Sequence, residues 1–425
     1  MNQKFPEAPE KKQVKKPPNA GDRSTTGEGS ARTGDIPTAP QLRRRAESLA
    51  EEERRAGIAT VLFSLTVAAA ALFVCLLVGM LTVRSALPSR GNSKPGVTTD
   101  GNGSGNSVTP TDPGAVLFTP GAAVLPSGAG TAKSISDISS SYAVLVDAST
   151  GQILAGKNAE AEFDPASLTK VMTLLVACQR LTTADLTQDL TYTEEIDRYL
   201  SLHYPGVEKK WDAVGDGGDL KDILYGIGVA SAADCTIMLV SYVCKASTVE
   251  ESEKAFVDLM NAEAAKMGLK NTRFDNSIGD SGENNKSTAS DMAAIMMRAL
   301  GSPLIRDILI QDKYVFQAFG YKPDGTFIPS YRMTFYGTLM GGTGGSRLDA
   351  YRNQFGKNVT YKLNTLSFQG GKTGSLKNSA NKWVYSLASF ATDPSGKIYI
   401  VVTGETQLNY GVLSDAKTIY DGYIN

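Results

Sequence analysis

The most constraining feature of this sequence is a run of 27 residues without a charged side chain, Gly57 to Val83. A membrane-spanning helix needs about 20 apolar residues, whereas the apolar part of a secretory signal has only about 7–15. The run therefore predicts a retained transmembrane helix over residues 57–83. A buried core helix is the disfavoured alternative. A secretory signal cleaved near Ser85 to Leu87 is a second alternative. The long basic segment before the run argues against such a signal.

The segments on either side of this run differ in composition. Residues 1–56 are rich in Lys, Arg, Pro, Gly and Ser and poor in large apolar residues, which is typical of a disordered tail. Residues 84–134 are rich in Gly, Ser, Thr and Pro without helical or strand periodicity, which indicates a flexible linker. Residues 135–425 remain for one folded domain, and this length is ample for a large core.

Positive charge gathers on the N-terminal side of the apolar run. Because basic residues flank membrane helices on the cytoplasmic side, we expect the tail in the cytoplasm and residues 135–425 outside it, at the cell membrane. The whole chain is near neutral, with 43 basic and 44 acidic residues, which argues against a nucleic-acid partner held by bulk charge. The basic residues near the run are Arg43, Arg44, Arg45, Arg54 and Arg55.

Ser167 and Lys170 lie three residues apart at the start of a predicted helix that continues through residues 171–177. Asp164 and Pro165 suit a helix entry, where a short polar side chain can cap and proline is tolerated. Residues at i and i+3 share a helix face, so both side chains can enter one pocket. A lysine whose pKa is depressed by burial or by a second cation can take the proton of a serine. The alternative is an ordinary amphipathic helix start.

Two further motifs lie downstream in the chain. Ser231 to Asp234 reads Ser-Ala-Ala-Asp and opens an apolar run, and Gly370 to Ser375 reads Gly-Gly-Lys-Thr-Gly-Ser. Glycines around Lys372 and Thr373 let backbone and cation approach a ligand carboxylate closely. The order Ser-x-x-Lys, Ser-Asp-Asn, Lys-Thr-Gly marks class A β-lactamases and penicillin-binding proteins.

The C-terminal two thirds of the chain, from about Ile135, resembles the low-molecular-mass penicillin-binding proteins, the serine D-alanyl-D-alanine carboxypeptidases of the peptidase S11 type. Several longer segments resemble the family in addition to the short motifs, and all of them come in family order. These segments are Tyr142–Asn158, Pro165–Thr173, Phe256–Ala264, Met267–Phe274 and Ser287–Ala293.

The resemblance implies a membrane-anchored, penicillin-sensitive D,D-carboxypeptidase that acts in peptidoglycan biosynthesis. Its substrate is the D-Ala-D-Ala end of a peptidoglycan stem peptide, and β-lactams are its covalent inhibitors. Ser167 forms the acyl-enzyme, Lys170 accepts the serine proton, and Ser231 relays a proton to the leaving amine. No cofactor and no metal are implied.

The resemblance also assigns the substrate-binding residues, which are Lys372, Thr373, Gly374 and Ser375. Lys372 and Thr373 bind the terminal carboxylate by charge-assisted hydrogen bonds. The oxyanion rests on the backbone N–H groups of Ser167 and Ser375, the first of them near a helix N-terminus.

The implied fold is the α+β fold of serine β-lactamases and penicillin-binding proteins. An N-terminal hairpin and the C-terminal runs 383–390 and 398–403, separated by a turn at residues 393–396, form one antiparallel sheet. A terminal helix over about residues 413–423 packs on the sheet. A helical subdomain carries Ser167 and Ser231, and the cleft lies at the junction of the two parts.

One departure from the family pattern is Ala233, where the family usually carries Asn. In the family this amide contacts the catalytic lysine and the substrate backbone, and alanine can do neither. A water or a neighbouring side chain substitutes, or activity is reduced. A weakly active or inactive penicillin-binding scaffold of the cell wall therefore stays open as an alternative. A β-lactamase is the other, although no Glu-x-x-Leu-Asn deacylation pattern lies between the second and third motifs.

Other residue types narrow the chemistry. His203 is the only histidine, which argues against a Ser-His-Asp triad and against a catalytic zinc site. The cysteines show no paired C-x-x-C spacing. Cys235 and Cys244 are nine residues apart and face opposite ways on one helix, whereas a bridge from Cys178 to either is conceivable. Buried free thiols are the preferred interpretation.

Overall fold

The computed structural model describes residues 114–280, 282, 284–322, 325–341 and 345–424. All of them belong to the second of the two units into which the chain divides, Ser104–Asn425. The predicted tail, the predicted transmembrane helix and most of the predicted linker lie outside these residues. In the part of the chain that is described, no helix has the length and apolar character needed to cross a membrane.

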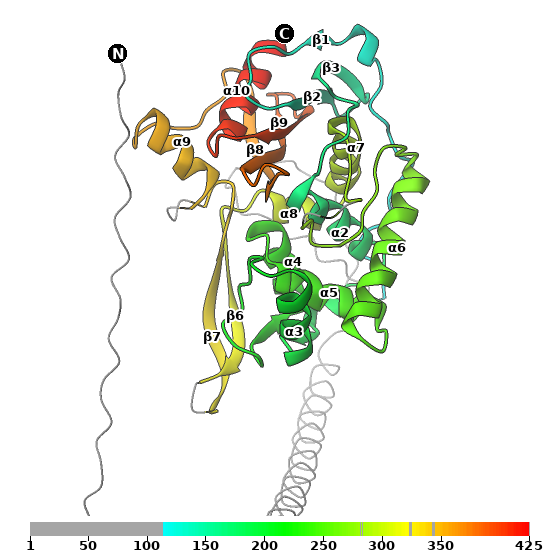
Figure 1. The fold of residues 1–425 in the computed structure, drawn as a ribbon, viewed down its shortest axis with the longest axis vertical. Helices are drawn as coiled ribbons and strands as arrows, with labels where there is room; N and C mark the ends of the chain where they lie inside the picture. The colour runs from blue at the N-terminus through cyan, green and yellow to red at the C-terminus, as the bar shows by residue number, and fades with distance from the viewer. Residues whose placement is uncertain (1–113, 281, 283, 323–324, 342–344, 425) are drawn as a thin grey trace, which may run out of the picture. The chain divides into compact units, whose positions relative to one another are not determined.

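A six-stranded sheet with the order β1-β3-β2-β10-β9-β8 forms the centre of the domain (Figure 1). All pairs are antiparallel except β1 with β3, which is parallel. Strand β8 lies at the edge of the sheet. The strands are β1 (Lys133–Ser134), β2 (Tyr142–Asp147), β3 (Gln152–Lys157), β8 (Ser367–Lys377), β9 (Trp383–Thr392) and β10 (Ile398–Thr406).

The two faces of this sheet bury different layers, because side chains alternate along a strand. On β2, Val144 and Val146 belong to the core shared with the helical part, whereas Ala143 and Leu145 belong to the core under the C-terminal helix. The helices of that second layer are α9 (Arg347–Phe355) and α10 (Gly411–Tyr423).

A helical part covers the other face, and a small sheet with the order β4-β5-β6-β7 adjoins it. Every residue of α2 is buried, so this helix forms the centre of the helical part. The helical elements are η3 (Ala166–Leu168), α2 (Thr169–Cys178), η4 (Ala184–Thr187), α3 (Glu194–His203), α4 (Leu220–Val229), α5 (Ala233–Cys244), α6 (Val249–Met267), α7 (Ala289–Leu300) and α8 (Pro303–Leu309), and η2 (Ala129–Thr131) precedes β1.

Strands β6 (Lys313–Tyr321) and β7 (Phe327–Tyr336) form a long hairpin that packs beside α4 (Figure 1). Its base is held by Trp211, whose ring makes edge contacts with Phe316 and Phe335. The other two strands of this sheet are β4 (Asp189–Thr191) and β5 (Gly217–Asp219).

The predicted α+β architecture is confirmed. The hairpin β2–β3 and the C-terminal strands share one antiparallel sheet, and the terminal helix packs on it. The strands are longer than predicted, and the terminal helix begins at Gly411 instead of residue 413. Cys178 and Cys235 are buried free thiols, and Cys244 is a partly exposed one.

Candidate active site

Ser167 lies in a tight turn that enters the buried helix α2. Asp164 accepts a hydrogen bond from the backbone N–H of Ala166 (2.9 Å), as expected for a short polar residue at a helix entry. Ala166 has φ = 50°, in the left-handed region that residues with a side chain rarely adopt. Such strain persists only where the surrounding structure holds it, and here it places Ser167 at the surface of a cleft.

Lys170 contacts the predicted nucleophile. Its Nζ lies 3.2 Å from Ser167 Oγ and also donates to the carbonyl of Ile278. The side chain is only 2% exposed, and this burial lowers the pKa of Lys170 to about 7, although the carboxylates of Asp280 and Asp234 oppose the shift. An amine with such a pKa is neutral in a large fraction of molecules near pH 7 and can accept a proton.

The turn that carries Ile278 packs directly against the nucleophile turn. Gly279 has φ = 70°, and a Cβ there would lie 2.0 Å from the carbonyl oxygen of Ala166. Asn276 closes this turn by accepting hydrogen bonds from the N–H groups of Gly279 (2.7 Å) and Asp280 (3.0 Å). The motifs of the sequence did not point to this segment, for which the spacing of Asn and Gly was the available turn signal.

Ser231 lies between α4 and α5 and also has a left-handed backbone, with φ = 59°. Its Oγ accepts a hydrogen bond from Nζ of Lys372 (2.9 Å), although the two residues are 141 positions apart in the chain. The second and third motifs therefore meet, as the sequence predicted.

Lys372 is fully buried in strand β8, and its Nζ also donates a hydrogen bond to the backbone carbonyl of Thr373 (3.0 Å). Burial, then the charges of Lys170 and Arg347, hold its pKa well below the ordinary lysine value. A Cβ at Gly371 would lie 2.2 Å from the carbonyl oxygen of the adjacent strand β9, so this position has room only for glycine. Thr373 shares a hydrogen bond between hydroxyl groups with a threonine after β7 (2.7 Å).

Gly374 and Ser375 continue β8 past the nucleophile turn. A Cβ at Gly374 would lie 2.9 Å from the carbonyl oxygen of Pro165 and 3.2 Å from Cβ of Ala166. The absence of a side chain therefore lets the strand approach this turn closely. Ser375 is exposed and lines the same cleft as Ser167.

Arg347 is a cleft residue that the sequence did not predict. The side chain lies 8% exposed at the start of α9, with its guanidinium 4.5 Å from the ring centroid of Tyr385. One Nη donates to Oδ1 of Asn409, whereas Nε has no hydrogen-bond partner among the described residues. Burial lowers the pKa of Arg347 to about 10. A buried cation without a carboxylate partner is costly, so this group is a candidate anion-binding group. No motif in the sequence marked it.

Ala233 is the first residue of α5 and lines the cleft. A segment from earlier in the chain, residues 208–211, covers this first turn of α5. The backbone N–H of Ala233 donates to the carbonyl of Glu208 (2.9 Å), and Glu208 and Lys210 also line the cleft.

The cleft has a volume of about 930 Å³ and unites all three motifs. Its walls come from the nucleophile turn, the start of α5, the end of β7, the start of α9 and strand β8. The residues that line it include Ser167, Lys170, Glu208, Lys210, Ser231, Ala233, Asp280, Arg347, Thr373 and Ser375.

The single histidine lies outside the cleft. His203 is the exposed last residue of α3, and its ring lies near the rings of Tyr199 and Tyr204. Within the described ranges, no group of three His, Cys, Asp or Glu side chains is arranged to hold a metal ion.

The fold and the meeting of Ser167, Lys170, Ser231 and Lys372 define the class of serine peptidases with the penicillin-binding fold. The crystal structure of the Streptomyces K15 DD-transpeptidase is similar over 67% of this chain and 96% of that protein, with a TM-score of 0.54 and 23% identity. At this identity the similarity supports the fold alone.

The profile of the peptidase S11 family, D-alanyl-D-alanine carboxypeptidase, matches residues 129–406, and the chain belongs to this family. D-alanyl-D-alanine carboxypeptidase DacC of Escherichia coli is 35% identical over 168 residues, which are 39% of each chain. D-alanyl-D-alanine carboxypeptidase DacF of Bacillus subtilis is 33% identical over 159 residues, 37% of this chain and 38% of the relative. The matches thus span under two fifths of these curated relatives.

Proposed function

We propose that this chain is a serine D,D-carboxypeptidase that removes the terminal D-alanine from peptidoglycan stem peptides. One observation carries the proposal: a buried lysine amine lies 3.2 Å from a serine hydroxyl in a cleft that is also lined by Ser231, whose hydroxyl accepts a hydrogen bond from Lys372. Family membership supports the same reaction.

In the proposed first step, Lys170 takes the proton of Ser167 as Oγ attacks the carbonyl of the penultimate D-alanine. Ser231, bound to Lys372, then relays a proton to the amine of the departing D-alanine. Backbone N–H groups of Ser167 and Ser375 hold the oxyanion, and removal of one such donor typically costs about 10²–10³ in rate. Water hydrolyses the resulting ester and regenerates the serine.

The substrate carboxylate binds the cationic side of the cleft in this proposal. Lys372 and Thr373 are the groups that the sequence suggested, and Arg347 adds a planar guanidinium beside them. Charge-assisted hydrogen bonds to a carboxylate are stronger than neutral ones. The bound substrate carboxylate also offsets the free-energy cost of burying Lys372 and Arg347, which have no carboxylate partner among the described residues.

β-Lactams acylate the same Ser167 in this proposal, because they resemble the acyl-D-Ala-D-Ala unit. The decisive experiment measures D-alanine release from a pentapeptide and labelling by fluorescent penicillin, with Ser167→Ala as the inactive variant. Ser330→Ala, an exposed serine on β7, is the matched control and keeps both activities. Labelling without D-alanine release supports a penicillin-binding scaffold instead, and rapid penicillin turnover supports a β-lactamase.

We also propose that residues 57–83 anchor the protein in the cell membrane with the tail in the cytoplasm. The uncharged run and the arginines before it support this topology. Leu72→Arg with Phe73→Arg places charges near the middle of the run, and each costs about 2.5–3.5 kcal/mol on insertion. We expect this variant to leave the membrane fraction on alkaline extraction, whereas Leu87→Arg stays bound. Equal extraction of both contradicts the anchor.

A further inference from the structure

Ala233, at the wall of the cleft, offers a bound peptide no polar side chain of its own. A peptide beside Ser167 brings backbone N–H and C=O groups against the first turn of α5, and these groups need partners once water is displaced. The N–H of Ala233 is already bound to the carbonyl of Glu208 (2.9 Å). A polar contact at this position therefore has to come from another segment.

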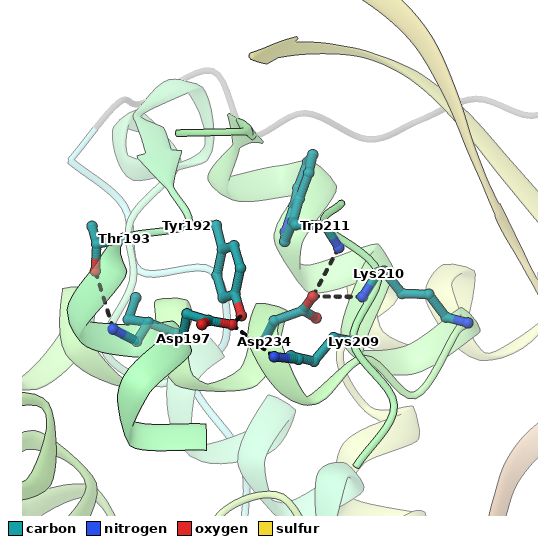
Figure 2. A network of polar contacts seen from close by, with 8 residues as sticks. Tyr192, Thr193, Asp197, Lys209, Lys210, Trp211 and Asp234 are labelled. Atoms are coloured by element: carbon teal, nitrogen blue, oxygen red, sulfur yellow. Dashed lines mark hydrogen bonds and ion pairs between the residues drawn. The ribbon is translucent and has the colours of Figure 1, made fainter. Parts of the chain in front are cut away.

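The segment that covers this turn is held by the buried carboxylate of Asp234. Oδ2 accepts hydrogen bonds from the backbone N–H groups of Lys210 (2.5 Å) and Trp211 (2.9 Å), as Figure 2 shows. Oδ1 accepts from the N–H of Cys235 (2.8 Å). Hydrogen bonds to an ionised acceptor are strong, and these join the covering segment to the start of α5.

Successive side chains of this segment point in different directions. Lys209 pairs with Asp197 on α3 (2.7 Å), away from the cleft, and Trp211 is buried against the β6–β7 hairpin. Lys210 lies between them, extends away from these contacts in Figure 2, and lines the cleft. The hydrogen bonds to Asp234 thus hold Lys210 at the cleft wall, whereas Lys209 points away from it.

Glu208 orients the ammonium group of Lys210. The two form an ion pair, with side chains 63% and 29% exposed respectively. Such partly exposed pairs contribute little to stability. An ammonium has three donors, so pairing with one carboxylate leaves two for another ligand.

We infer that Lys210 is a substrate-binding residue that donates a hydrogen bond to a backbone carbonyl of the acyl peptide, at the wall where Ala233 has no polar side chain. This inference rests on the proposed function. Lys210 thus supplies from a different segment of the chain the polar contact that an asparagine at position 233 would make. The hydrogen bonds to Asp234 hold this segment in place.

The test is a rescue experiment on the full-length protein with a pentapeptide that ends in D-Ala-D-Ala. Lys210→Ala is expected to lower kcat/KM by about tenfold to a hundredfold, as for loss of a hydrogen bond from a charged donor. Lys210→Arg keeps most of the activity. Ala233→Asn raises kcat/KM in the Lys210→Ala background by a larger factor than in the parent, because the amide then supplies the missing contact. Lys209→Ala is the matched control and leaves kcat/KM unchanged.

Three results overturn the inference. One is a Lys210→Ala variant as active as Lys209→Ala. Another is a loss of kcat/KM in Lys210→Ala that the added Ala233→Asn does not reverse. The third is that Ala233→Asn changes kcat/KM by the same factor in the parent and in Lys210→Ala. If the parent releases no D-alanine, the proposed function fails, and the rate of fluorescent penicillin labelling of the same variants decides the role of Lys210. A parent without labelling overturns both proposals.

Discussion

Lys170 on α2 and Lys372 on β8 are both buried at the active site, the first beside Ser167 and the second beside Ser231, and their surroundings differ in charge. Around Lys170, the carboxylates of Asp280, Asp234 and Glu253 raise the pKa against burial, and the result is a value of about 7. Around Lys372, burial and the cations Lys170 and Arg347 all lower the pKa.

The difference shows how two residues of one type acquire different roles. An amine whose pKa lies near neutral pH exchanges a proton readily, which suits the helical wall for general base catalysis. Lys372 and Arg347 are buried cations without a carboxylate partner among the described residues, and this is costly until an anion binds, which suits β8 and α9 for binding a carboxylate. Substitutions on each wall and the pH profile test this division into a proton-transfer wall and an anion-binding wall.

Lys170→Ala is expected to have the largest effect. Loss of a general base typically costs about 10²–10⁴ in rate, and we expect this loss for D-alanine release and for acylation by fluorescent penicillin alike. Stopped-flow labelling and D-alanine assays measure both rates. A variant within tenfold of the parent on either ligand would show that another group takes the serine proton.

Arg347→Gln is expected to have the next largest effect. Loss of a charge-assisted hydrogen bond lowers kcat/KM by about tenfold to a hundredfold for a peptide with a free carboxylate, and by much less for the same peptide as a carboxamide. Arg352→Gln, on the same helix, is the control and changes neither value. Equal losses on both peptides would assign Arg347 a structural role instead.

The pH profile of kcat/KM should fall on the acid side with an apparent pKa of about 7. Lys170 must be neutral to accept a proton, and its pKa lies at about 7, so activity is lost as pH drops below this value. The decline approaches tenfold per pH unit. A profile that stays level down to about pH 5 would contradict a lysine base with this pKa.

Glu253→Gln is expected to have the smallest effect, a shift of the acid limb to lower pH. Glu253 is buried on α6, binds the backbone N–H and the hydroxyl of Ser277 (2.7 Å each), and raises the pKa of Lys170 by its charge. Without that charge the pKa of Lys170 falls further. Glu251→Gln, exposed on the same helix, leaves the limb in place. A shift to higher pH would contradict this account.

The sequence allowed the main elements and most of the site to be predicted. Strands β9 and β10 follow from two apolar runs separated by turn residues, which are local signals. The hairpin β2–β3 was expected from the family resemblance. Ser167, Lys170, Ser231, Lys372 and Thr373 each lie in a short motif, so the motifs and the family resemblance singled them out without knowledge of packing.

Only the tertiary structure decided which groups complete the cleft and what charge each carries. Arg347 meets Asn409 and Tyr385 from distant positions, the turn at Gly279 reaches Ala166, and the segment of Lys210 is fastened to Asp234. These contacts join segments that are far apart in the chain. The pKa of a buried lysine likewise depends on burial and on charges brought near it by folding, and no local pattern of residues records either quantity.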